Sequence, residues 1–138
     1  MSTRSRIGLQ LEDGSILSVY HHWDGFPEWL GRILNTHYNS KDKAAELIDG
    51  GDMSSAWTKS RWTRDGVTEV AEYGPEYYSE RGEDCPPGID DSLEDYLADG
   101  EEYAYVYTGD KWVCYDRHAF DYRLEPEVVA IPTGALGE

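Results

Sequence analysis

Alternating apolar residues on both sides of an Asp-Gly pair constrain the fold of this chain more than any other feature of its sequence. Every second residue over positions 7–11 is apolar, an Asp13-Gly14 pair follows, and a second β-rich run occupies positions 16–20. Aspartate and glycine tolerate the positive φ angles of a tight turn, so such a pair commonly joins two antiparallel strands. The sequence therefore predicts a β-hairpin near the N-terminus.

A second hairpin is predicted near the C-terminus. Positions 103–107 read Tyr-Ala-Tyr-Val-Tyr, and a Gly109-Asp110 pair leads into the β-rich positions 111–115. Alternate side chains of a strand share one face, so the three tyrosines are expected on the same side of the sheet. One more apolar run, at positions 128–131, follows this hairpin.

Two short helices are predicted after the first hairpin. Pro27 presets the backbone for a helix start, and positions 30, 33, 34 and 37 form an apolar stripe with helical spacing, so a helix is expected over 27–38. A second helix is expected over 40–49, with Asn39 or Ser40 as its cap and Gly50-Gly51 at its end. The two helices should form a hairpin that lies against the sheet.

The middle of the chain predicts another pair of strands and then a long loop. Positions 57–62 and 67–73 have the composition of strands around an Arg64-Asp65-Gly66 turn. Glycine and proline are frequent among the carboxylates that follow, beginning with Gly74-Pro75. Positions 74–91 are therefore predicted to form a surface loop.

A third short helix completes the predicted fold. The Ser92 hydroxyl can accept a hydrogen bond from a free backbone amide, and Gly100 would end the helix. A chain of 138 residues can bury one hydrophobic core, and neither a repeat nor a low-complexity tract divides it. We therefore expect a single acidic α+β domain over residues 1–138. An antiparallel sheet, built from the N- and C-terminal hairpins, packs against the first two helices, and the acidic loop and third helix lie on one side.

The acidic residues are concentrated in one segment. The net charge is −16, and positions 65–110 hold 15 acidic residues and one basic residue, Arg81, whereas the other positions hold 13 acidic and 11 basic residues. Such a segment creates a negative potential that attracts basic surfaces and repels nucleic acid and anionic membranes. The predicted partner is a protein with a basic surface, and direct binding to nucleic acid or to a membrane is not expected. The oligomeric state is left open.

Residues 20–27 form the most distinctive local motif, Tyr-His-His-Trp-Asp-Gly-Phe-Pro, and Gly31 follows it inside the first predicted helix. The structural interpretation of this motif needs no ligand. His22 and Asp24 hydrogen-bond to fix a turn, and Trp23 packs in the core. Gly25 and Pro27 shape the entry to the helix. The predicted structural residues are Tyr20, His22, Trp23, Asp24, Gly25, Pro27 and Gly31.

The motif resembles that of a family of small uncharacterised proteins of bacteriophages and prophages, which typically read Tyr-x-His-Trp-Asp-Gly-Tyr-Pro and then have a glycine inside the helix. The likeness continues through positions 47–55, 81–84, 102–107 and 111–112. His21 stands where relatives often have cysteine, and Phe26 replaces the usual tyrosine. The resemblance implies a phage-like origin. Small acidic phage proteins often inhibit or redirect host machinery, such as restriction, CRISPR or transcription complexes, so that role is the expectation here. The resemblance assigns no activity.

The acidic segment and its neighbouring tyrosines are the candidate binding surface. Carboxylates spaced along a surface can imitate duplex phosphates and occupy the basic groove of a nucleic-acid-binding protein, so the protein is a candidate DNA mimic. The alternatives are a partner bound through aromatic side chains and a structural phage protein with a merely solvated acidic face. The candidate partner-binding residues are Glu69, Glu72, Glu76, Glu80, Glu83, Asp84, Asp90, Asp91, Glu94, Asp95, Asp99, Glu101, Glu102, Tyr77 and Tyr78.

A metal-binding enzyme is the main catalytic alternative. His21, His22 and Asp24 offer suitable ligands, but adjacent residues of a strand point to opposite faces, so the two histidines are not expected to reach one ion. No nucleophile elbow, phosphate-binding glycine loop or dinucleotide motif is present. We therefore predict a protein without catalytic residues, metal or cofactor.

The cysteines indicate the compartment. Cys85 and Cys114 are the only two, and neither a secretory leader nor a run of about 18 apolar residues is present. Reduced thiols in the cytoplasm of the host cell are therefore expected, with Cys114 as a buried structural thiol in the second hairpin.

Overall fold

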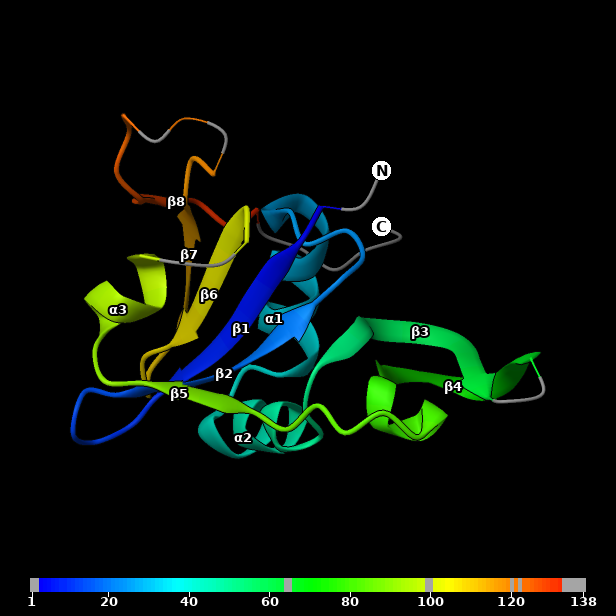
Figure 1. The fold of residues 1–138 in the computed structure, drawn as a ribbon. Helices are drawn as coiled ribbons and strands as arrows, with labels where there is room; N and C mark the ends of the chain where they lie inside the picture. Colours follow the sequence, from blue (N-terminus) through cyan, green and yellow to red (C-terminus); the bar gives the residue numbers. More distant parts are fainter. Residues whose placement is uncertain (1–2, 64–65, 99–100, 120, 122, 133–138) are drawn as a thin grey trace.

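The computed structural model describes residues 3–63, 66–98, 101–119, 121 and 123–132. These residues form a sheet of eight strands with three short α-helices, one π-helical turn and one 3-10 turn (Figure 1). In chain order the elements are β1 (Ser5–Gln10), β2 (Ile16–His21), η1 (Pro27–Gly31), α1 (Arg32–His37), α2 (Lys41–Asp49), β3 (Met53–Thr63), β4 (Gly66–Tyr77), η2 (Tyr78–Arg81), β5 (Gly88–Asp90), α3 (Leu93–Ala98), β6 (Tyr103–Tyr107), β7 (Trp112–Asp116) and β8 (Glu127–Val129).

The α+β class and both terminal hairpins are confirmed. The strand order is β4-β3-β2-β1-β6-β7-β8, with β5 paired to β2 away from this path. The sheet is mixed, however, and the expectation of a wholly antiparallel sheet is wrong, because β1 and β6 pair in parallel. The direction of β6 follows from where the chain returns after α3: the Glu102 amide bonds to the Arg4 carbonyl, so β6 begins beside the start of β1. Two apolar strands thereby complete the centre of the sheet.

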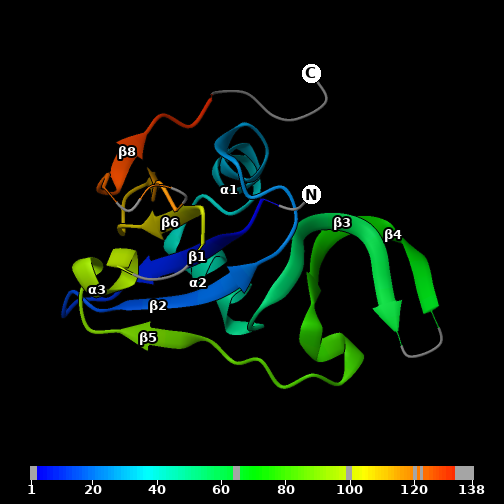
Figure 2. The ribbon, with the colours of Figure 1, turned by 45° about the horizontal axis from the view of Figure 1, so that its top comes forward.

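Helices cover both faces of this centre. One core joins the inner face of β1 and β6 to α1 and α2, and it includes Ile7, Tyr105, Leu34 and Ile48. The other face of the same strands packs on α3, whose Tyr96 is 1% exposed and donates its hydroxyl to the Tyr105 carbonyl at 2.9 Å. Figures 1 and 2 show α1 and α2 on one side of the sheet and α3 on the other.

The predicted helix starts and ends hold where the structure describes them. The helix expected over 27–38 begins with the π-helical turn η1 and continues as α1. The Ser40 hydroxyl accepts from the Lys43 amide at 3.1 Å to cap α2, and the Ser92 hydroxyl accepts from the Asp95 amide at 3.1 Å before α3. The expected stop at Gly100 lies outside the described residues. None of the described helices is long and apolar enough to cross a membrane.

β3 and β4 form a long hairpin that extends away from the rest of the sheet (Figure 2). β3 pairs with β2 at a single position, His21 with Met53, whereas it pairs with β4 from Met53 to Thr63 with three shifts of register. We call residues 57–63 and 66–73 the arm. Arg64 and Asp65 of the predicted turn lie outside the described residues.

The surface loop predicted over 74–91 is wrong at both ends. β4 continues to Tyr77, and β5 occupies the other end and pairs antiparallel with β2. Pro75 is tolerated inside β4 because that strand lies at the edge of the sheet and its pairing with β3 shifts register between Ser55 and Thr58. The acidic segment therefore has regular structure at positions where its prolines predicted none.

Candidate functional site

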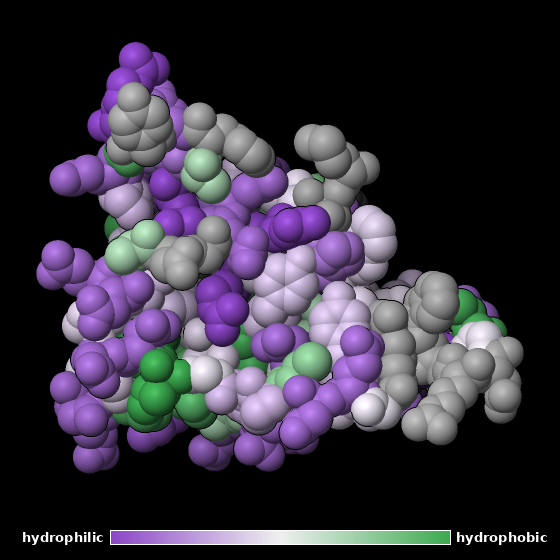
Figure 3. Space-filling model, viewed as in Figure 1, coloured by the Kyte–Doolittle hydropathy of each residue, from purple (hydrophilic) through white to green (hydrophobic). Residues whose placement is uncertain are grey.

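The acidic segment runs along one side of the molecule. In Figure 1 it passes from the arm through η2 and β5 to α3, and Figure 3 shows hydrophilic side chains over much of that side. Most of its predicted carboxylates are exposed, while Asp90, Glu101 and Glu102 are half-buried and Asp99 lies outside the described residues. We call the exposed set the acidic band: Glu69, Glu72, Glu80, Glu83, Asp84, Asp91, Glu94 and Asp95.

The acidic band is exposed to solvent and lies outside the salt bridges between described residues. The ion pairs between described residues join His118 to Asp116 and Glu127, and Arg123 to Asp121. None of these pairs includes a carboxylate of the acidic band. The band therefore presents negative charge to solvent from side chains that belong to successive elements.

The fold changes the ionisation of Glu80 in the acidic band. Partial burial raises the pKa of its carboxyl, the nearby charge of Glu76 raises the pKa further, and Arg61 lowers it. The arginine reaches this place from β3, so the band meets opposite charge beside η2.

Glu76 does not belong to the exposed surface that the sequence predicted. Its side chain is 4% exposed, and its Oε1 accepts a hydrogen bond from the hydroxyl of Ser54, which is itself 2% exposed. The carboxylate is buried because β4 pairs with β3 here, with Glu76 opposite Ser55. A buried carboxylate needs hydrogen-bond donors, so we correct Glu76 from a partner-binding residue to a structural one.

Replacing Ser54 with alanine is expected to lower the free energy of unfolding by about 1–3 kcal/mol, because it removes a donor from a buried carboxylate. The matched control is Ser79→Ala, whose hydroxyl is exposed, with an expected change within about 0.5 kcal/mol. Urea unfolding of both variants at neutral pH measures the difference. Equal values for the two would show that the Ser54 hydroxyl does not stabilise Glu76.

Tyr77 and Tyr78 are also less accessible than predicted. Tyr77 donates its hydroxyl to the Leu47 carbonyl at 2.7 Å, and burial raises the pKa of its phenol. Its ring packs on Gly50, where a Cβ would overlap the ring carbons. Tyr77 therefore attaches β4 to the end of α2, and both tyrosines are half-buried instead of forming an open aromatic surface.

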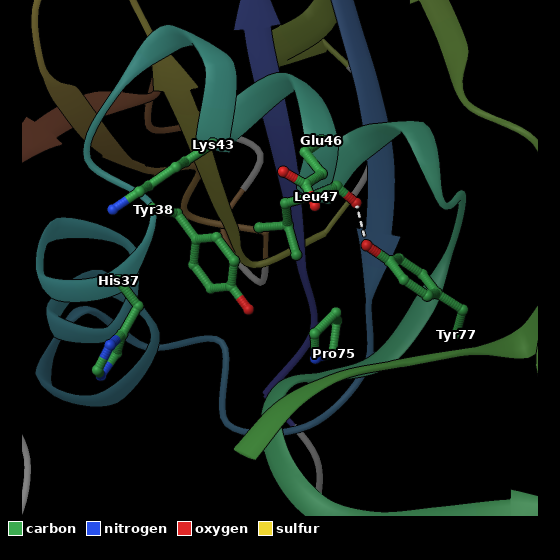
Figure 4. Close-up of a pocket in the computed structure, with 7 residues that line it drawn as sticks. All are labelled: His37, Tyr38, Lys43, Glu46, Leu47, Pro75 and Tyr77. Atoms are coloured by element: carbon green, nitrogen blue, oxygen red, sulfur yellow. Dashed lines mark hydrogen bonds between the residues drawn. The ribbon is translucent and has the colours of Figure 1, made fainter. Parts of the chain in front are cut away.

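A pocket of about 240 Å³ lies between the helices and β4 (Figure 4). Leu47 and Pro75 supply apolar walls, and the hydroxyl of Tyr38 is fixed by the Ala56 carbonyl at 2.8 Å. Lys43 and Glu46 bring opposite charges to the pocket from α2. The sequence did not predict this pocket, because its walls come from segments that are distant in the chain.

Beside this pocket, three rings form a stack that the sequence did not predict. The His37 and Trp57 ring centroids are 3.6 Å apart, and those of Trp57 and Tyr73 are 5.5 Å apart, with both pairs nearly parallel. The Lys59 ammonium lies 5.2 Å from the Tyr73 ring centroid, over the ring. The stack fixes the base of the arm against α1. The contact of Trp57 with Tyr73 could have been inferred from the predicted strand pair, whereas nothing local indicated His37.

The N-terminal motif places Trp23 at the surface. This side chain is 49% exposed, so the expectation that it packs in the core is wrong. The reason is the end of β2 at His21, after which Asp24 adopts a φ of 54° and the chain leaves the sheet. The Trp23 ring lies edge-on to His22, whose Nδ1 is 2.6 Å from the Tyr20 hydroxyl. Tyr20 is thus a partner of His22 that the sequence did not predict.

The glycines of the motif allow close packing. The Gly25 amide donates to the Thr3 carbonyl at 2.8 Å, and its own carbonyl accepts from the Tyr105 hydroxyl at 2.7 Å. A Cβ on Gly25 would lie 2.5 Å from the Ser5 hydroxyl oxygen, and one on Gly31 would lie 2.8 Å from Ile131. The turn after β2 and the following helix are therefore held against β1, β6 and the segment after β8.

The two adjacent histidines occupy different environments. His21 is fully buried and its Nε2 accepts from the Ala56 amide at 3.0 Å, whereas His22 is half-buried and Asp24 is exposed. Burial, with the nearby charge of His22, lowers the pKa of His21 to about 3. Among the described residues, no group of three histidine, cysteine, aspartate or glutamate side chains is arranged to hold a metal ion.

Both cysteines are free thiols. Cys114 is buried and Cys85 is half-buried, and burial raises the pKa of the Cys114 thiol to about 12. A thiol with a raised pKa is a weak nucleophile at neutral pH.

Comparisons of the chain with protein-family models, with curated proteins and with solved structures give no match.

Proposed function

We propose that this protein is a non-enzymatic accessory protein that binds a basic surface of another protein through the acidic band. The observation that carries the proposal is that the exposed carboxylates come from one continuous segment. None of them belongs to an ion pair between described residues. A surface of one charge sign attracts a complementary surface and accelerates the encounter between the two proteins.

The order of the band supports the finer part of the proposal, that it imitates the charge of a nucleic acid. Its carboxylates follow one another through β4, η2, the turn after η2, the residue after β5 and then α3, along one side of the molecule (Figure 1). The resemblance to phage proteins favours a host or defence protein as the partner, in the cytoplasm of the host cell. In this role the protein inhibits its partner by occupying a groove that otherwise receives nucleic acid.

The test is a pull-down from a bacterial host lysate at low and high salt, followed by affinity measurement with the purified partner. Two variants with the same change in charge are compared. Each replaces three exposed carboxylates with neutral isosteres: Glu83, Asp84 and Glu94 in the band variant, and Glu12, Asp49 and Glu125 in the control variant.

We expect a basic partner that is retained at low salt and released at high salt. The band variant should bind about tenfold more weakly, since three rim contacts of roughly 0.2–1 kcal/mol each are lost, and the control variant should bind nearly as the native protein does. Equal weakening by both variants, or enrichment that salt does not change, would contradict the proposal.

A further inference from the structure

The arm leaves one strand edge open to solvent. β4 is the terminal strand of the sheet, so one of its edges pairs with β3 and the other has no strand beside it among the described residues. Figure 2 shows that the arm stands apart from the other strands of the sheet. Hydrogen-bonding groups on such an edge can pair with a strand from another chain.

Both faces of the distal half of β4 are exposed as well. Every residue over positions 67–73 is exposed, and the apolar members are prominent: Val67 is 54% exposed, Val70 37% and Tyr73 53%. An isolated two-stranded hairpin is only marginally stable in water, and a third strand would extend its hydrogen-bonded ladder and cover these side chains. The exposure of the arm thus favours an added strand over a contact with one face alone.

The charges on β4 indicate which kind of strand from another chain would pair with its free edge. Glu69 and Glu72 are both exposed there, and the acidic band continues beyond the strand at Glu80 and Glu83. Opposite charges on neighbouring strands stabilise their pairing, whereas like charges directly opposite one another destabilise it. A basic strand that also carries apolar residues would match both the carboxylates and the valines of this edge.

The same charges oppose pairing between two copies of this chain. Two β4 strands paired along this edge would bring Glu69 and Glu72 of both copies together at one junction. Repulsion among these four carboxylates would destabilise the dimer near neutral pH. The pattern therefore disfavours a second copy and favours a basic segment.

We propose that β4 accepts an extended basic segment of the partner protein as an added strand along positions 67–73. This inference rests on the proposed function, since the acidic band attracts the partner, and it specifies how part of that partner docks. Backbone hydrogen bonds to β4 supply affinity, Glu69 and Glu72 pair with basic side chains, and Val67 and Val70 contact apolar ones.

The experiment uses the full chain and a short peptide of lysine, valine and threonine in which each lysine lies two positions from a valine, as Glu69 lies two positions from Val67. Hydrogen exchange of the amides at positions 67–73 is measured with and without the peptide, and the dissociation constant is measured by calorimetry. A second peptide has the same sequence with every backbone nitrogen methylated, so it keeps the charge and loses its hydrogen-bond donors. We expect exchange at these positions to slow at least tenfold with the first peptide, and the methylated peptide to bind at least tenfold more weakly.

Two variants with the same change in charge distinguish an added strand on β4 from electrostatic attraction to the acidic band as a whole. Glu69→Gln with Glu72→Gln should weaken the first peptide about fivefold, whereas Glu94→Gln with Asp95→Asn, on α3, should change its affinity less than twofold. Equal binding of the two peptides, equal effects of the two variants, or unchanged exchange over 67–73 would overturn the added strand. Slow exchange there caused by self-association would also overturn it. None of these four results bears on the proposed function, which is tested separately by the pull-down.

Discussion

Replacing Gly51 with alanine is expected to lower the free energy of unfolding by about 3 kcal/mol, from two separate causes. Gly51 follows α2 with a φ of +89°, a conformation that strains an L side chain by about 1–2 kcal/mol. A Cβ there would also overlap the carbonyl oxygen of Cys85. That oxygen accepts from the Asp52 amide at 2.9 Å, so the backbone can relieve the overlap only by disturbing this bond, at a cost of about 1–3 kcal/mol.

Gly14→Ala is the matched control for this prediction. Gly14 has nearly the same φ, +90°, but nothing lies within 4 Å of the position that its Cβ would take. The control should therefore show only the strain of about 1–2 kcal/mol. Urea unfolding of both variants measures the difference. If Gly51→Ala lowers the free energy of unfolding no more than Gly14→Ala does, the overlap with Cys85 does not affect stability.

Local signals predicted the hairpins and helices, whereas the pairing between distant strands needed the structure. Each of these local signals acts within a few residues: the Asp13-Gly14 turn, the Ser40 cap and the Ser92 cap. Neighbouring residues in the sequence are therefore enough to predict the turn and the two helix starts. The parallel pairing of β1 with β6 has no such local signal, because it depends on where α3 returns the chain. Pro75 misled the prediction for the same reason: whether a strand tolerates proline depends on its being at an edge.

Charge was easier to predict from the sequence than exposure. The acidic segment does supply a band of exposed carboxylates, but Glu76 is buried and Tyr77 is bound to α2. Strand periodicity would predict the face of each residue, yet register shifts between β3 and β4 interrupt that periodicity. Trp23 shows the opposite error, because a large aromatic ring was assigned to the core although the chain leaves the sheet just before it.

Acid is expected to destabilise this protein through His21. The ring is fully buried and its Nε2 accepts from the Ala56 amide at 3.0 Å, so protonation would bury a charge and break that bond. The pKa of His21 is about 3 in the folded chain, lowered chiefly by burial, against an ordinary 6.5. Between these values the unfolded chain binds more protons than the folded chain, so stability falls as the pH decreases below about 6.5. From pH 7 to pH 5 the loss is about 2 kcal/mol.

The prediction is tested by the pH dependence of unfolding in the native chain and in two variants. His21→Gln retains an oxygen that can accept from the Ala56 amide and removes the titrating ring, whereas His22→Gln removes the half-buried neighbour. The free energy of urea unfolding should depend on pH between 7 and 5 more weakly in His21→Gln than in the native chain, by about 2 kcal/mol over that range. His22→Gln should retain most of the native dependence, because its ring is only half-buried and contributes to the lowered pKa of His21 less than burial does. An unchanged pH dependence in His21→Gln would mean that the acid sensitivity arises elsewhere, since the other titrating groups are the same in both proteins.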